Sequence, residues 1–432
     1  MSFSTVTIGA AVLFGFVGLV LVLRRPRTRA RKKPVPAVPP VPAVPVPAVE
    51  VVALGISGSG KTVYLASLFH ELHVPAEDRP FYLRADAEQR VGLSSVLREV
   101  TDASLPWPRG TLVGETRQFG FDCMARTPEG WVPVLRVNYL DYAGEVLELA
   151  SAQNLQALKD LETRVEQADA VIGMLDGRQL LRYLNSEPAG LAYVAAAIQP
   201  MVGLLVATSS PVYLVITKWD LVRGFGEPSG ADDNERLELV RHALFTLPQL
   251  RGLIRTRDIV RLVPVSAVGP HFATLDAVTG GVAKRTDGRL EPMNVEVPLA
   301  AVVPDLLRRF SQTFSQQADD SVNGQVRNLM RMSPAEWGGA VASVLTKPAG
   351  VAVRAALSTV LGRPFSTELV GMMLEWMSKP YDRKSAEVDA FRGAAERQLY
   401  AVAQARIEVL EHFQKTMYLF EARLPASRLW LS

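Results

Sequence analysis

The chain has 432 residues, of which 48% are hydrophobic and 21% are charged, so it can bury one large domain with an accessory domain, or two domains. Its formal net charge is +3, but residues 24–33 hold seven positive charges and no acid, which leaves 3 − 7 = −4 for the remainder. A mildly acidic remainder excludes a general nucleic-acid partner for the folded part. One cysteine, Cys123, excludes an internal disulfide framework, and five scattered histidines give no zinc-type spacing.

The amino-terminal segment predicts a membrane anchor. Residues 6–23 form an uncharged run of 18 residues, about 27 Å long as a helix, which is just enough for a bilayer core of about 30 Å. No basic residue precedes the run and the basic cluster at 24–33 follows it, so the positive-inside rule places the amino terminus outside and the rest in the cytoplasm. We expect a retained single-pass anchor over 1–25; a cleaved signal or a buried core helix stays open. The basic cluster would contact anionic lipid headgroups.

A spacer is expected next, within a linker over residues 26–49. Residues 34–49 contain seven prolines, which disfavour helix and central strand and favour polyproline II. At about 3.1 Å per residue this is a semi-rigid spacer of roughly 50 Å. A ligand for SH3-like domains is the alternative, although the run contains no basic residue.

A glycine-rich loop follows the apolar run at 51–54 and precedes a helical pattern at 61–70. This strand–loop–helix carries G-x-x-x-x-G-K-[ST], a pattern whose backbone N–H groups and helix N-terminus wrap a phosphate chain. Lys61 can reach the β- and γ-phosphates, and the Thr62 hydroxyl can ligate Mg²⁺. The expected phosphate-binding residues are Gly55, Ser57, Gly58, Ser59, Gly60, Lys61 and Thr62.

A second motif ends the apolar run at 132–140, where Asp141 is followed three residues later by Gly144 and then by Glu145. Asp141 at a strand end can hold Mg²⁺ through water, and the Gly144 N–H can meet a γ-phosphate. For the threonine that would close on Mg²⁺ we select Thr111, with Thr116 next, although either also fits a plain turn.

A third motif follows two further apolar runs. The apolar run at 211–216 leads into Thr217, Lys218 and Asp220, and the run at 260–265 leads into Ser266 and Ala267. Guanine offers two adjacent donors, N1–H and N2–H₂, which one carboxylate at Asp220 can accept together. Lys218 can lay its stem along the base, and the Ala267 N–H can meet guanine O6.

The remaining pattern alternates strands and helices. We expect further strands at 80–84, 119–124 and 170–176 and helices at 88–100, 147–167 and about 188–207. Trp107 and Trp131 are interpreted as packing residues.

In their order along the chain, the four motifs resemble those of the Ras-like P-loop GTPases of the translation-factor-related (TRAFAC) class. The resemblance covers roughly residues 50–318 and implies an α/β, Rossmann-like, mostly parallel sheet with helices on both faces. It further implies GTP/GDP and Mg²⁺ at the carboxyl ends of the strands, with insertions near 71–110, 178–207 and 223–235. The lead-in at 294–299 looks like the bacterial double-GTPase group, and the anchor-plus-GTPase layout is similar to the signal recognition particle receptor beta subunit.

The sequence differs from the family's motifs at one position that bears on hydrolysis. Glu145 stands where many relatives place a water-orienting glutamine, and a carboxylate beside the γ-phosphate predicts slow hydrolysis or a Glu145 that points away. The expected catalytic residues are Lys61, Gly144 and Glu145.

Taken together, the motifs and the anchor predict a membrane-anchored GTP/GDP switch with Mg²⁺-dependent hydrolysis. A membrane-bound scaffold with a structural, slowly hydrolysed nucleotide stays open; a P-loop ATPase or kinase would make residues 217–220 a coincidence.

Residues 319–432 carry no catalytic pattern. The apolar run at 341–361 is interrupted by Lys347, Pro348 and Arg354, so no second membrane span is expected. Beyond Pro380, apolar residues recur at helical spacing and predict an amphipathic helix of about 40 residues. This helix would pack on the chain's own helices, or it would bind a protein effector or partner.

Overall fold

The computed structural model describes residues 46–109, 117–142, 155–225, 232–276, 281–317 and 394–429, with residues 368, 369 and 372. All of them belong to the compact unit Val44–Ser432, which is distinct from the unit Met1–Ala43. The expected anchor, the basic cluster, Thr111, Thr116, Gly144 and Glu145 lie outside the described residues, so what was inferred for them stays a prediction.

A seven-stranded sheet in the order β2-β3-β4-β1-β5-β6-β7 forms the centre of the fold. The strands are β1 (Ala48–Leu54), β2 (Phe81–Arg84), β3 (Arg117–Thr127), β4 (Gly130–Asp141), β5 (Ala170–Asp176), β6 (Val212–Thr217) and β7 (Val260–Pro264). Strands β4, β1, β5, β6 and β7 pair in parallel, as predicted. Every residue of β5, β6 and β7 is buried, which is why these strands read as continuous apolar runs.

One edge of the sheet departs from a uniform parallel arrangement. Strands β2, β3 and β4 pair antiparallel, and β3 and β4 form a hairpin in which β4 begins at Gly130, with φ +131°. The other departure is at the start of β1, which begins at Ala48, inside the stretch that the proline pattern assigned to the spacer. There Ala48 is the partner of Arg136 on β4.

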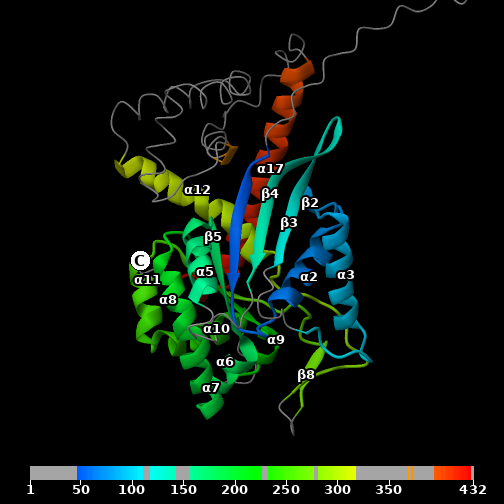
Figure 1. Cartoon of the computed structure of the whole chain (residues 1–432). Helices are drawn as coiled ribbons and strands as arrows, with labels where there is room; N and C mark the ends of the chain where they lie inside the picture. The colour runs from blue at the N-terminus through cyan, green and yellow to red at the C-terminus, as the bar shows by residue number, and fades with distance from the viewer. Residues whose placement is uncertain are drawn as a thin grey trace, which may run out of the picture. The chain divides into compact units, whose positions relative to one another are not determined.

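Helices cover both faces of the sheet (Figure 1). They are α2 (Lys61–Leu72), α3 (Ala87–Thr101), α5 (Leu155–Gln167), α6 (Gly177–Leu184), α7 (Pro188–Tyr193), the π-helix η2 (Val194–Ile198), α8 (Gln199–Ala207), α9 (Trp219–Val222), α10 (Asp233–Phe245), α11 (Pro248–Thr256), α12 (Val297–Gln317) and α17 (Ala394–Arg423). Two successive residues of β5 show which helices cover each face of the sheet. Ile172 borders a small cavity with Leu299 of α12, whereas the next residue, Gly173, faces Met201 and Leu205 of α8.

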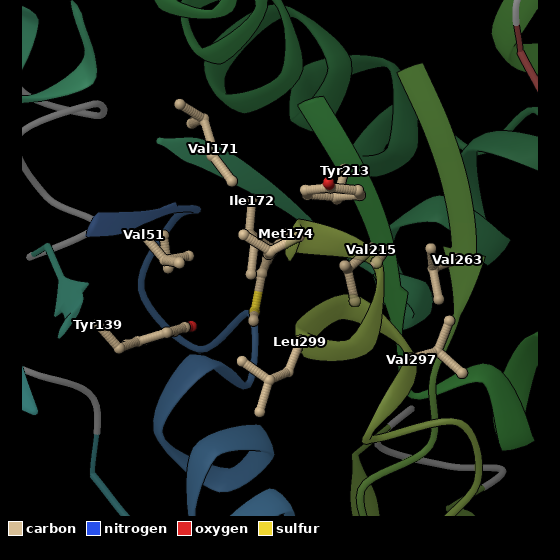
Figure 2. Close-up of a cluster of buried hydrophobic side chains, with 14 of the residues drawn as sticks. Val51, Tyr139, Val171, Ile172, Met174, Tyr213, Val215, Val263, Val297 and Leu299 are labelled. Atoms are coloured by element: carbon tan, nitrogen blue, oxygen red, sulfur yellow. The ribbon is translucent and has the colours of Figure 1, made fainter. Parts of the chain in front are cut away.

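The core on the α12 side joins several strands to one helix. Val51, Tyr139, Ile172 and Met174 lie near Leu299 in this cluster (Figure 2). Because the carboxyl ends of β1, β4, β5, β6 and β7 are all anchored in one continuous apolar core, the loops that leave them start from a rigid edge.

The carboxyl-terminal helix packs on its own chain. The described part of helix α17 is 30 residues long and contacts α12 as well as strands β3 and β4. Its buried Phe413 meets Phe81 of β2 edge-on at 5.1 Å between ring centroids. After the helix, Arg428 forms an antiparallel bridge with Arg261, and the Leu429 N–H donates to Val260 O at 3.2 Å. The tail thus covers the edge of β7, whose unpaired backbone groups would otherwise be exposed.

In the part of the chain that the structure describes, one helical stretch, Pro188–Ala207, is long and apolar enough to cross a membrane by those criteria alone, and half of it is buried inside the protein.

Candidate functional site

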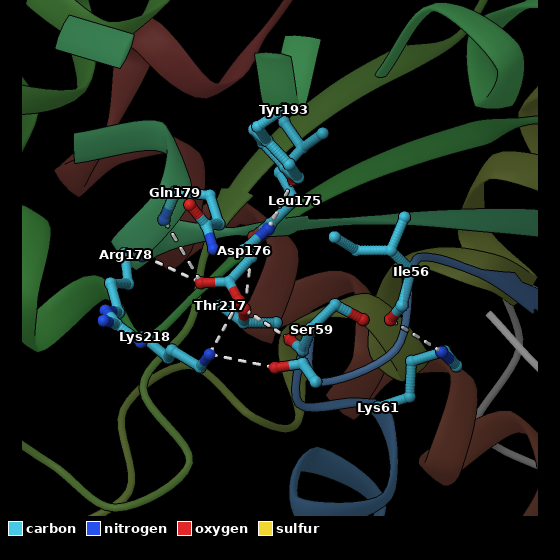
Figure 3. A network of polar contacts seen from close by, with 11 residues as sticks. Ile56, Ser59, Lys61, Leu175, Asp176, Arg178, Gln179, Tyr193, Thr217 and Lys218 are labelled. Atoms are coloured by element: carbon cyan, nitrogen blue, oxygen red, sulfur yellow. Dashed lines mark hydrogen bonds and ion pairs between the residues drawn. The ribbon is translucent and has the colours of Figure 1, made fainter. Parts of the chain in front are cut away.

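The glycine-rich loop adopts the conformation that its glycines permit. Gly58 and Gly60 have φ values of +75° and +91°, a region that disfavours side chains with a Cβ, and Gly60 is the residue before helix α2. Lys61, only 6% exposed, donates from Nζ to the carbonyl oxygens of Gly55 at 2.7 Å and Ile56 at 3.3 Å. The loop therefore curls around its own lysine at the amino end of α2, which is a ready anion site (Figure 3).

Two oxygen groups meet beside this loop. The Thr62 hydroxyl donates to Asp141 Oδ2 at 3.2 Å, although the residues are 79 positions apart, and Asp141 is fully buried at the end of β4. The described residues hold no cluster of three or more His, Cys, Asp or Glu side chains that could hold a metal. A hydroxyl and one carboxylate fit Mg²⁺, which takes few protein ligands and completes its shell with water and substrate phosphates.

The third motif touches the first directly. Thr217 Oγ1 donates to Ser59 O at 2.7 Å and to Leu175 O at 3.1 Å. Lys218 lies in the left-handed region with φ +53°, and its Nζ donates to Gly58 O at 2.9 Å and to Asp176 Oδ2 at 2.8 Å (Figure 3). These bonds hold the lysine stem against the phosphate loop. An αL backbone at a non-glycine residue is costly and persists where the surroundings over-determine it.

Asp220 is held by the loop after β7. Ser266 Oγ donates to Asp220 Oδ1 at 2.6 Å and accepts from the Gly269 N–H at 2.8 Å. Burial raises the pKa of the Asp220 carboxyl above its usual range, and the hydrogen bond from Ser266 opposes that rise. The loop itself is fixed to α2, because Ser67 Oγ donates to the Ala267 carbonyl at 2.8 Å.

These groups line or support one cavity of about 300 Å³. Its lining includes Ser57, Gly58, Ser59, Gly60, Lys61, Thr62, Thr217, Lys218, Asp220 and Ala267. Three expected residues support the lining from behind: Gly55 packs against Met174, Asp141 bonds to Thr62, and Ser266 bonds to Asp220. The glycine-rich loop and the Thr217–Asp220 motif therefore open into the same cavity rather than to opposite sides of the molecule.

Several residues that line the cavity or support its lining were not assigned to the site from the sequence. Asp176 orients Lys218 and also accepts from the Arg178 N–H at 2.9 Å; its only sequence signal is a carboxylate at the end of a buried strand. Arg178, Arg109 and Val282 line the cavity and belong to no motif. Trp107 packs edge-on against Phe272 at 6.2 Å, as a packing residue should, but it lines the cavity as well.

Comparison with solved structures finds chains of similar fold, one of which is described here. No family model matches the chain, and no curated protein matches it. A solved structure of the signal recognition particle receptor SRb-GTP/SRX complex from Chaetomium thermophilum is similar at 15% sequence identity, with a TM-score of 0.29, over 52% of this chain and 93% of that chain.

Proposed function

We propose that this chain is a guanine-nucleotide-binding switch protein that binds GTP and GDP with Mg²⁺ and is held at a membrane by its amino-terminal segment. The observation that carries the proposal is the shared cavity: Lys61 and Asp220, which belong to motifs 159 positions apart, line it together. A phosphate chain at one end and a guanine at the other would satisfy both groups at once.

Each part of the nucleotide has a matching group. The loop N–H groups and Lys61 bind the phosphates, and the stem of Lys218 lies along the base while Asp220 accepts its two donors. When bound, Mg²⁺ would neutralise charge on the β- and γ-phosphates, and Thr62 and Asp141 are the residues that would hold it. The proposal includes Mg²⁺-dependent hydrolysis of GTP, with Lys61, Gly144 and Glu145 as the catalytic residues.

Titration calorimetry of the full-length protein tests the guanine assignment. We expect GTP and GDP to bind at micromolar concentration or tighter and ATP roughly a hundredfold or more weakly, because adenine leaves the buried Asp220 carboxylate without its donors. Lys61→Ala should abolish binding, and Asp220→Asn should reduce the preference for guanine. Equal affinity for GTP and ATP would overturn the assignment.

Single-turnover hydrolysis tests the role as a switch, and membrane fractionation tests the amino-terminal anchor. A GTP hydrolysis rate that depends on Mg²⁺ and changes in Glu145→Gln supports a switch; a rate that neither factor alters points to a structural nucleotide on a membrane-bound scaffold. For the anchor, the full chain should sediment with membranes and resist alkaline carbonate, whereas release by carbonate would contradict a spanning helix.

A further inference from the structure

One wall of the cavity comes from two segments that carry none of the nucleotide motifs. The first is residues 107–109, and the second is the hairpin of β8 (Ala273–Leu275) and β9 (Val282–Lys284). They are joined by a hydrogen bond from Trp107 Nε1 to Val282 O at 2.7 Å, across 175 positions of sequence. The indole N–H is thereby used, so Trp107 is fixed by the hairpin and not by its own segment.

Lys284 ties the two segments together more strongly. Its Nζ donates to Asp102 O at 2.9 Å, Leu105 O at 2.8 Å and Pro106 O at 3.4 Å, and also to Glu99 O. These carbonyl groups lie at and beyond the carboxyl end of α3, where helix carbonyls lack partners and the helix dipole favours a cation. One ammonium group therefore holds both the end of α3 and the chain leading to Trp107.

The same lysine lies over the tryptophan. Its Nζ is 5.1 Å from the centroid of the Trp107 ring, within the range of a cation–π contact. Loss of the charge would remove the carbonyl contacts and the ring contact together.

The wall is also packed against the nucleotide loops. Val268, which follows Ala267, forms a small apolar cluster with Val100, Phe272 and Ala273, and Val63, which follows Thr62, packs against it with Trp107. A shift of the wall would be transmitted to the phosphate end through Val63 and to the base end through Val268.

From this arrangement we propose that Lys284 is a positioning residue of the nucleotide site, which holds Trp107 in the cavity wall and thereby slows nucleotide release. The inference rests on the proposed function. Changes at one interface usually alter the dissociation rate more than the association rate, so the effect of Lys284 is expected in release.

The test is release of N-methylanthraniloyl-GDP from the full-length protein, chased with excess unlabelled GDP. Lys284→Met keeps the length of the apolar stem and removes the charge; Lys159→Met, at an exposed position of α5, is the matched control. We expect release to be about tenfold faster in Lys284→Met, because several hydrogen bonds to a charged group are lost, and unchanged in the control. Lys284→Arg should restore part of the slow release.

Two further readouts separate positioning from simple loss of structure. Energy transfer from tryptophan to the bound label should fall in Trp107→Phe but not in Trp131→Phe, since Trp131 does not line the cavity. The effect of Lys284→Met should largely disappear in a Trp107→Ala background, because there is no ring left to position. The same effect with and without Trp107, or unchanged release in Lys284→Met, would overturn the inference.

The outcome also separates a failure of this inference from a failure of the proposed function. If the unmodified protein does not bind the labelled GDP, the proposed function fails and this inference fails with it. If it binds tightly and Lys284→Met releases at the normal rate, only the positioning role is refuted. Thermal unfolding without nucleotide, compared between Lys284→Met and Lys159→Met, shows whether the variant is folded.

Discussion

Lys218 Nζ and Asp176 Oδ2 lie 2.8 Å apart, and this ion pair joins the ends of two neighbouring parallel strands, β6 and β5. Asp176 is 5% exposed and also accepts from the backbone N–H groups of Arg178 and Gln179. The carboxylate is therefore fixed by the start of α6, and it in turn fixes the lysine whose stem would lie along the base.

The first prediction concerns this pair. Asp176→Asn keeps the shape of the side chain but removes the charge that orients Lys218, so GDP affinity should fall by roughly tenfold, the value of a charged hydrogen bond. Calorimetry on the full-length protein measures the change. Asp122→Asn is a suitable control, because Asp122 also pairs with arginines but lies on β3 away from the cavity. Equal affinities in both variants would contradict the role of Asp176.

The second prediction concerns pH. Burial raises the pKa of Asp220, so between the usual aspartate value and this raised value the folded state holds a proton that the unfolded state has lost. Stability without nucleotide therefore decreases as pH rises through that window, whereas guanine binding, which needs the carboxylate, becomes stronger. Calorimetry of GDP binding across mildly acidic pH checks the direction.

Ser266→Ala provides the internal control for this pH dependence. It removes the hydroxyl that donates to ionised Asp220, so the pKa should rise further and the loss of GDP affinity on acidification should begin at a higher pH. An unchanged pH profile in Ser266→Ala would show that another group controls binding.

The third prediction concerns the stability of the fold and a buried ion pair of β7. Arg261 of β7 donates to both oxygens of Asp305 on α12, at 2.5 and 2.6 Å, and also pairs with Glu421 of α17. Asp305→Ala removes two hydrogen bonds from a buried arginine, so the free energy of unfolding should fall by about 3–5 kcal/mol. Urea denaturation measures this fall. Asp287→Ala breaks the exposed pair with Arg285 and should cause no comparable loss.

The sequence predicts those parts of the site whose residues lie close together along the chain. Strand-end motifs around Lys61, Asp141 and Asp220 were recognisable because each follows an apolar run, and parallel strands bring their carboxyl ends to one edge. The parallel sheet and the helices on both faces followed from the same alternation. The antiparallel pairing of β2, β3 and β4 did not, because short alternating strands pair in either direction.

What the sequence did not show depends on distant contacts. Asp176 and Lys218 are 42 positions apart, and Lys284 reaches carbonyl groups more than 170 positions away, so no local pattern joins them. Helix α17 was recognisable by its periodicity, but its contact with strands β3 and β4 was not, since an apolar stripe does not name the surface that it covers.

The last prediction concerns Thr62 and Asp141, which are joined by a hydrogen bond and are the two residues proposed to hold Mg²⁺. Thr62→Ala removes one oxygen ligand but leaves the loop N–H groups and Lys61, so GDP affinity in EDTA should hardly change while the gain in affinity on adding Mg²⁺ should shrink roughly tenfold or more. Thr62→Ser retains the hydroxyl and should preserve most of that gain. Calorimetry with and without Mg²⁺ measures the gain, and an equal Mg²⁺ effect in the alanine and serine variants would place the metal elsewhere.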